Sequence, residues 1–89
     1  ETNTKELVAT LKEKRFNDMR KWVIQNIDKE PSSMFRNLYE VLWKALDPKS
    51  IPQAVLVIAG YQYKAGFVAD QEINMVACLT EIMANCKFK

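Results

Sequence analysis

Residues 67–83 read FVADQEINMVACLTEIM, and this stretch decides the fold. Asp70 can accept a hydrogen bond from a free backbone N–H of a first helical turn, and Glu72 places negative charge where the helix dipole favours it. The second half is a run of Met, Val, Ala, Cys, Leu and Ile that only Thr80 and Glu81 interrupt. A helix that is apolar on nearly every side must be covered on nearly every side. We therefore expect a helix that lies at the centre of the domain or buries its second face against a partner.

Two predicted helices open the chain and form a hairpin. The first covers about residues 4–13 and the second about residues 15–27, each with apolar side chains on one stripe. The polar segment Lys12–Arg15 between them is a short hinge. Thr4 is the expected N-cap of the first helix, because its hydroxyl can accept a hydrogen bond from the first turn.

The third predicted helix has the strongest amphipathic pattern. Residues 28–33 form the clearest break before it, since Pro31 disfavours helix at Glu30. Ser32 or Ser33 can cap the helix that follows. Its apolar residues recur at the spacing of one helical face: Phe35, Leu38, Tyr39, Leu42, Trp43 and Leu46.

The start of the fourth predicted helix is open between two positions. Asp47 can cap a helix that has Pro48 at its first position. Ser50 can instead cap a helix in which Pro52 lies in the first turn. A strand is the competing interpretation of residues 54–59, because runs of β-branched residues fit both patterns. Helices on either side and the lack of a second strand to pair with favour the helix.

Composition predicts one all-α domain over residues 1–89, built as a compact bundle of about five helices. A chain of 89 residues can form a single core and no second one. Its 48% of apolar residues excludes wholesale disorder, and two Gly and three Pro are too few for a succession of tight β-turns. Gly66 is expected to end the fourth helix in the left-handed conformation. The first residue is Glu rather than Met, which favours a piece of a longer protein.

The two cysteines indicate neither a disulfide nor a metal site. Cys78 and Cys86 would lie about 12 Å apart on a continuous helix, beyond disulfide reach. No CxxC motif or histidine accompanies them, so Cys78 is expected to be a small buried apolar residue. Nothing demands an oxidising compartment, and a cytoplasmic location is expected. The longest apolar run is too short to span a bilayer, so no membrane contact is expected.

Catalytic chemistry is sparse in this sequence. There is no histidine, which removes the commonest general base and metal ligand. Gly60 and Gly66 stand alone, so no phosphate-binding loop is present. Asp70 and Glu72 lie on different faces of a helix start and are best explained as a cap and a first-turn charge. We expect that the chain itself is not an enzyme and binds no cofactor or metal.

Four aromatic residues are the candidates for contact with a partner protein. Tyr61, Tyr63 and Phe67 lie near the junction of the fourth and fifth helices. Tyrosine suits interfaces because an apolar ring carries a polar tip. Trp43 is an anchor of the core or of an interface by the same argument. The alternative for the first three is that they close the end of the bundle.

Residues 66–73 carry the pattern G-x-x-A-D-x-E-I after a predicted helix and before the apolar terminal helix. With this pattern, the chain from Val8 to Lys89 resembles the C-terminal collar domain of the phage-type sliding-clamp-loader ATPase subunit, which is related to the small subunits of replication factor C. Further residues that carry the resemblance are Leu11, Lys12, Lys14, Arg20, Phe35, Leu38, Pro48, Ser50, Ile51 and the ending Phe88-Lys89.

The resemblance implies a non-catalytic oligomerisation domain of a DNA-replication protein. In that family an ATPase module precedes the collar, and the collar holds the subunits in a ring of five. ATP and Mg would bind the upstream module, because this chain lacks the phosphate loop, the acidic metal-binding motif and the sensor arginine. The implied partners are other clamp-loader subunits, a sliding clamp and primer–template DNA, in the host cytoplasm if a phage encodes the protein. Pro52 and the two Trp residues depart from the family's pattern.

Two other interpretations stay open. A free-standing helical adaptor that binds another protein would have the same composition and the same surplus of aromatic residues. A small DNA-binding domain would use the basic cluster at the first hinge to contact phosphates. Acidic residues interrupt that cluster, which favours a solvated surface. The cluster consists of Lys12, Lys14, Arg15, Arg20 and Lys21.

Overall fold

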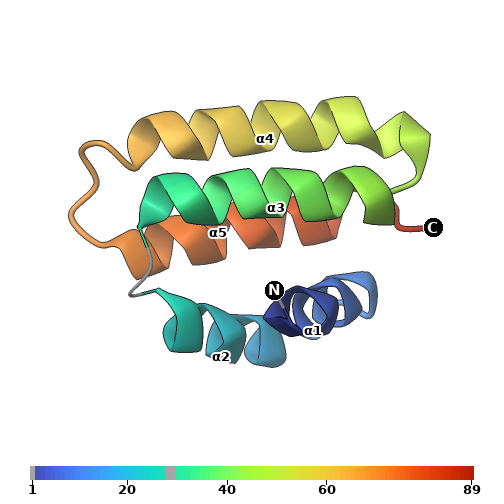
Figure 1. Ribbon diagram of the computed structural model, residues 1–89, viewed down its shortest axis with the longest axis horizontal. Helices are drawn as coiled ribbons and strands as arrows, with labels where there is room; N and C mark the ends of the chain where they lie inside the picture. The colour runs from blue at the N-terminus through green and yellow to red at the C-terminus, as the bar shows by residue number, and fades with distance from the viewer. Residues whose placement is uncertain (1, 28–29) are drawn as a thin grey trace.

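The protein is an all-α bundle, as the sequence predicted (Figure 1). The computed structural model describes residues 2–27 and 30–89. No strand occurs in these residues, and only an isolated bridge joins Leu46 to Phe88. The helices are α1 (Thr2–Lys12), α2 (Phe16–Asn26), α3 (Pro31–Ala45), the short 3₁₀ helix η1 (Pro48–Ser50), α4 (Ile51–Lys64) and α5 (Gln71–Asn85).

The helices stack so that α4 is an outer layer and α5 lies inside. In Figure 1, α4 runs along one side of the molecule, α3 and α5 follow beneath it, and α1 and α2 cross the opposite side. Contacts join α5 to α4, to α2 and to α1. Of the two alternatives predicted for the terminal helix, a central position or a second face buried against a partner, the structure shows the central position.

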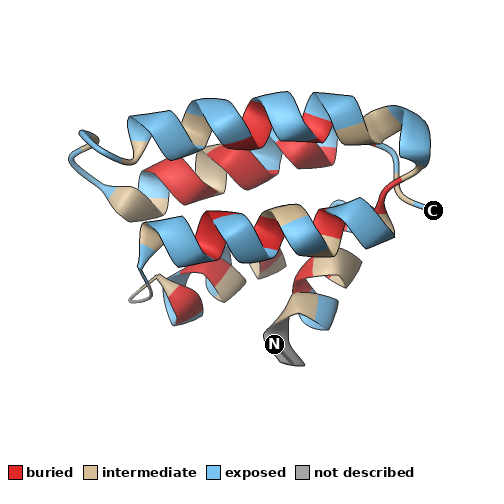
Figure 2. Ribbon diagram, turned by 45° about the horizontal axis from the view of Figure 1, so that its top comes forward, coloured by how far each residue is buried: buried red, intermediate tan, exposed pale blue. Residues whose placement is uncertain are grey.

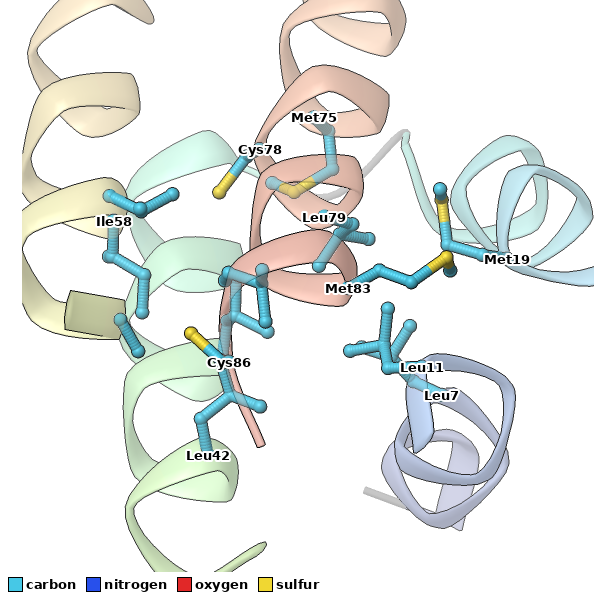
Figure 3. Packing of buried hydrophobic residues seen from close by; sticks show 14 of the residues in the cluster. Leu7, Leu11, Met19, Leu42, Ile58, Met75, Cys78, Leu79, Met83 and Cys86 are labelled. Atoms are coloured by element: carbon cyan, nitrogen blue, oxygen red, sulfur yellow. The ribbon is translucent and has the colours of Figure 1, made fainter. Parts of the chain in front are cut away.

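The core forms around α5, where Met75, Cys78 and Leu79 are almost fully buried. Figure 3 shows Met83 of the same helix pointing toward the hairpin of α1 and α2, while Ile58 of α4 lies on the other side. Burial of these side chains is the main favourable term in folding. One stripe of α5 stays uncovered, however: Ile73, Thr80 and Ala84 are exposed. The expectation that this helix is covered on nearly every side is correct for about half of its circumference only.

Helix starts differ in part from those predicted. α1 begins at Thr2, so Thr4 lies inside the helix instead of capping it. α3 begins at Pro31, which takes the first helical position after the extended residue Glu30. Ser32 and Ser33 therefore lie in the first turn, and neither caps the helix. Residues 28 and 29 of the predicted break lie outside the described part of the chain.

Of the two residues predicted to cap the fourth helix, Asp47 caps the short helix η1 and Ser50 caps no helix. The Asp47 side chain accepts a hydrogen bond from the Lys49 N–H and caps η1. α4 follows directly, with Pro52 in its first turn. The Ser50 hydroxyl does not cap α4 and instead accepts a hydrogen bond from the N–H of Lys87, at 2.9 Å. Residues 54–59 are helical, which excludes the strand.

The turns of the chain use different residues from those expected. Gly66 does not adopt the left-handed conformation, and α4 ends in successive turns whose N–H groups return to carbonyls of its last residues. The described residue with positive φ is Lys14, at 58°, which ends the α1 turn. Its ammonium group donates to the carbonyl of Met83 at 3.2 Å, and this places a cation at the negative end of α5.

Asp70 caps α5 as predicted. Its carboxylate accepts hydrogen bonds from the N–H groups of Glu72 and Ile73, at 2.9 and 3.2 Å. The turn before it is held by two side chains of the same helix. Gln71 donates to the carbonyl of Ala65, and Asn74 donates to the carbonyl of Tyr61. These hydrogen bonds thus fix the direction in which the chain passes from α4 to α5.

Candidate protein-interaction surface

The four aromatic residues proposed for partner contact fall into two groups. Tyr63 and Phe67 are exposed, at 76% and 67%, and their rings meet edge to face at 5.2 Å. Trp43 on α3 is 54% exposed and contacts the ring of Tyr39 at 5.8 Å. Exposed tyrosine and tryptophan side chains are enriched at protein–protein interfaces.

The fourth residue, Tyr61, lies on the inner side of α4 and links it to α5. Its hydroxyl donates a hydrogen bond to a carboxylate oxygen of Glu81. This hydrogen bond, together with burial and the Glu81 charge, raises the pKa of Tyr61 to about 12. The Lys64 ammonium lies 4.6 Å from the centre of the same ring. Tyr61 is thus engaged within the domain, whereas Tyr63 and Phe67 are available to a partner.

The exposed rings of Tyr63 and Phe67 belong to a larger apolar face along the outside of α4. Leu56 is 70% exposed, and it matters here because it lies in a row with other exposed apolar residues. We call this face the α4 surface, and it consists of Pro52, Leu56, Ala59, Gly60, Tyr63 and Phe67, all exposed. The helical members follow the spacing of one face, opposite the buried Ala54, Val57 and Ile58. Figure 2 shows the exposed and buried sides of this helix.

Sequence reasoning found Tyr63 and Phe67 but missed Leu56 and Gly60. A signal was present, because α4 carries apolar residues on both of its sides. A surface helix of a lone domain carries them on one side only.

The α4 surface is almost free of charge. Between Lys49 and Lys64 the chain has no charged residue, so the face is apolar along its length with a cation at each end. Charged residues are depleted at the centres of protein–protein interfaces, and contiguous exposed apolar patches mark interaction sites. The lack of charge and the run of exposed apolar residues favour a protein partner.

The fold of the domain does not require glycine at position 60. Gly60 lies inside α4 and is exposed, and a Cβ built on it meets nothing within 4 Å. Its φ is not positive, so the backbone does not require glycine. Glycine in a helix interior costs about 0.5–1 kcal/mol relative to alanine. The domain gains nothing from Gly60 in its own packing.

The basic hinge is largely used within the domain. Arg15 forms ion pairs with Glu13 and Asp18, at 2.9 and 2.8 Å. Arg20 lies 3.8 Å from Glu72, and Lys14 contacts the end of α5. Three of the five cations proposed for phosphate contact therefore have partners in the bundle, which weakens the DNA-binding interpretation.

The described residues offer little for small-molecule chemistry. The pocket between α1, α2, α3 and α5 holds about 30 Å³, room for a water molecule or two. Two wider and more open hollows, of about 600 and 370 Å³, lie between α1 and α3 and between α1 and α2, and no histidine or cysteine lines either of them. Burial raises the pKa of the Cys78 thiol to about 12, so it stays protonated and unreactive. Within residues 2–27 and 30–89, no group of three His, Cys, Asp or Glu side chains could hold a metal ion. No helix in the same ranges is long and apolar enough to cross a membrane.

Comparison of this chain with known protein families and with curated proteins finds no match.

Proposed function

We propose that this chain is the oligomerisation domain of a sliding-clamp-loader subunit. It would hold ATPase subunits in the ring that places the clamp on primer–template DNA. The observation that carries the assembly role is the α4 surface: an apolar, uncharged face with Leu56 and Tyr63 largely in water. The specific replication role is supported by the resemblance of residues 8–89 to the collar domain. ATP, Mg, the clamp and DNA would bind other parts of the assembly.

The proposal is tested in the full-length parent protein. We expect Tyr63→Ala combined with Phe67→Ala to convert the ring into single subunits, while nucleotide binding by the upstream module is retained. Sedimentation velocity measures the first property and a nucleotide titration the second. Phe16→Ala, which truncates an exposed ring on α2, is the matched control and should leave the ring intact. A doubly substituted parent that sediments as a complete ring would overturn the proposal.

A free-standing helical adaptor is the second candidate, because the α4 surface with its two terminal cations also fits an amphipathic helix with acidic flanks. The two candidates differ in what precedes Glu1 in the reading frame. A phosphate-binding loop in the same frame supports the clamp loader. A frame that encodes the bundle alone supports the adaptor.

A further inference from the structure

We infer that the α4 surface receives Trp43 from a second copy of this chain, with the indole lying over Gly60. This inference rests on the proposed function for the identity of the partner, and adds which surfaces meet. A ring of like subunits uses a heterologous contact, in which two different patches of each subunit meet. The aromatic rings that lie in water on α3 and on α4 provide two such patches.

We call the part of the α4 surface between Leu56 and Tyr63 the notch, because small residues lie there between two large ones. Leu56 and Tyr63 are large and largely exposed, at 70% and 76%. Ala59 and Gly60 lie between them on the same helix and are small. A flat ring can therefore approach the backbone at Gly60 while the two larger side chains flank it. Close approach of another group is a recurrent reason for glycine at a position that the fold leaves free.

Trp43 has the properties of the inserted group. Its side chain is 54% exposed, and on its own helix it is supported by Tyr39, which packs against the core. Tryptophan is enriched among the residues that dominate binding energy. A ring that is already held by a neighbour loses little rotational freedom on binding.

Among the charges near the two patches, Glu40 on α3 and Lys64 on α4 form one complementary pair. Glu40 lies one turn before Trp43, and its carboxylate is half exposed in a pair with Arg36. Lys64 lies one turn after Gly60. When α3 of one copy runs antiparallel to α4 of the next, with Trp43 over Gly60, Glu40 comes beside Lys64. On α4 no charged residue lies under the indole, whereas on α3 the exposed Lys44 is next to Trp43 and Arg36 precedes it by two turns.

The contact is expected to be weak in the isolated domain. α4 is 14 residues long, or about 21 Å, so the buried area falls below the roughly 1,200 Å² of stable complexes. For such a small contact we expect a dissociation constant on the order of 100 µM. In a full-length parent, further modules would add to it.

The experiment mixes two variants of the domain, each with one patch removed. Gly60→Gln fills the notch with a residue that favours helix, and Trp43→Ala removes the inserted ring. Sedimentation equilibrium is run from about 50 µM to about 1 mM. We expect each variant alone to associate at least tenfold more weakly than the wild-type domain. The equimolar mixture should form one-to-one pairs as strongly as the wild-type contact, since each variant keeps the patch that the other lacks.

Controls and contrary outcomes are specific. Ala84→Gln and Phe16→Ala make similar changes at other exposed positions and should associate like the wild-type domain. Leu56→Ala is a second notch variant, and circular dichroism establishes that all variants fold. A monomeric mixture would overturn the inference. So would undiminished self-association of Trp43→Ala, which would mean that α4 pairs with α4.

The mixing experiment can fail while the collar proposal holds, and the collar proposal can fail while the mixing experiment succeeds. A mixture that stays monomeric, with a parent ring that Tyr63→Ala and Phe67→Ala disrupt, removes the Trp43 contact and leaves the collar proposal standing. If the full-length parent never forms a ring but the mixed variants pair, the collar proposal is removed and the Trp43 contact stands.

Discussion

The two sides of α4 have similar composition and opposite surroundings. Ala54 and Ile58 on the inner side are 2% and 5% exposed, whereas Leu56 and Tyr63 on the outer side are 70% and 76% exposed. Apolar character alone therefore does not separate core from interface in this helix. The separation comes from which side α3 and α5 already occupy. Because the domain has closed its core without the outer side, that side is available to a partner.

The largest expected effect comes from truncating one side chain on the inner side of α4 and, separately, one on its outer side. Ile58→Ala should destabilise the domain by about 2–4 kcal/mol, because it removes buried methyl groups and leaves a cavity. Leu56→Ala should change the free energy of unfolding by no more than about 0.5 kcal/mol, because the side chain is mostly in water. Urea denaturation at low protein concentration measures both. Equal losses would mean that the outer side is part of the core.

A smaller effect distinguishes Tyr61 from its neighbour Tyr63. Tyr61→Phe removes the hydroxyl that binds Glu81 and should cost about 1 kcal/mol of stability without changing association. Tyr63→Phe should cost almost nothing in stability. Urea denaturation and sedimentation of both variants test this. If Tyr61→Phe lowers the free energy of association more than it lowers the free energy of unfolding, Tyr61 belongs to the interface.

The hydrogen bond from the Tyr61 hydroxyl to Glu81 predicts that the stability of the domain depends on pH. The pKa of Tyr61 is raised to about 12 in the folded domain from 10.0. Above pH 10 the unfolded chain therefore loses this proton while the folded domain keeps it, and stability falls as pH rises from 10 toward 12. The contribution is fully present below pH 10. Melting temperatures from pH 9 to 11 should fall more steeply for the wild-type domain than for Tyr61→Phe, and parallel curves would contradict the assignment.

Gly60→Ala should have two effects of opposite sign. The free energy of unfolding should rise by up to about 1 kcal/mol, since alanine favours helix and the added Cβ meets open space. Self-association should weaken severalfold because the notch is partly filled. Thermal melting and sedimentation equilibrium measure the two effects. A variant that is more stable and associates equally well would leave Gly60 without a role at the interface.

The smallest expected effect is electrostatic. Lys64→Glu and Glu40→Lys should each weaken association a few-fold at low salt, and the double variant should recover it, because rim charges contribute modestly. Ala84→Lys is a control for net charge alone. Failure of the double variant to recover would mean that Glu40 and Lys64 do not meet in the assembly.

Local signals made most of the helices predictable. The spacing of Leu38 and Leu42 marks one face of α3, and Asp70 is a cap that depends on its immediate neighbours alone. The contacts that were missed join residues distant in the chain. Lys14 reaches the carbonyl of Met83, and Ser50 binds the N–H of Lys87. Such pairs depend on the packed fold, which periodicity does not encode.

The candidate surface was half predictable for a similar reason. Exposed aromatic residues near the end of α4 were expected, because Tyr63 and Phe67 exceed what one end of a small bundle can enclose. Tyr61 was assigned to the same group because it is close in sequence, although it is on the opposite side of the helix. Leu56 was not singled out, because its exposure depends on where α3 and α5 pack.

Sedimentation equilibrium of the wild-type domain tests most directly whether the α4 surface binds a neighbouring subunit. One chain has a mass of 10.3 kDa. We predict an average mass that rises above this value with concentration, and that returns to it when Leu56 and Tyr63 are both changed to Ser. A wild-type domain that keeps the mass of a single chain up to about 1 mM, well above the expected dissociation constant, would contradict the account.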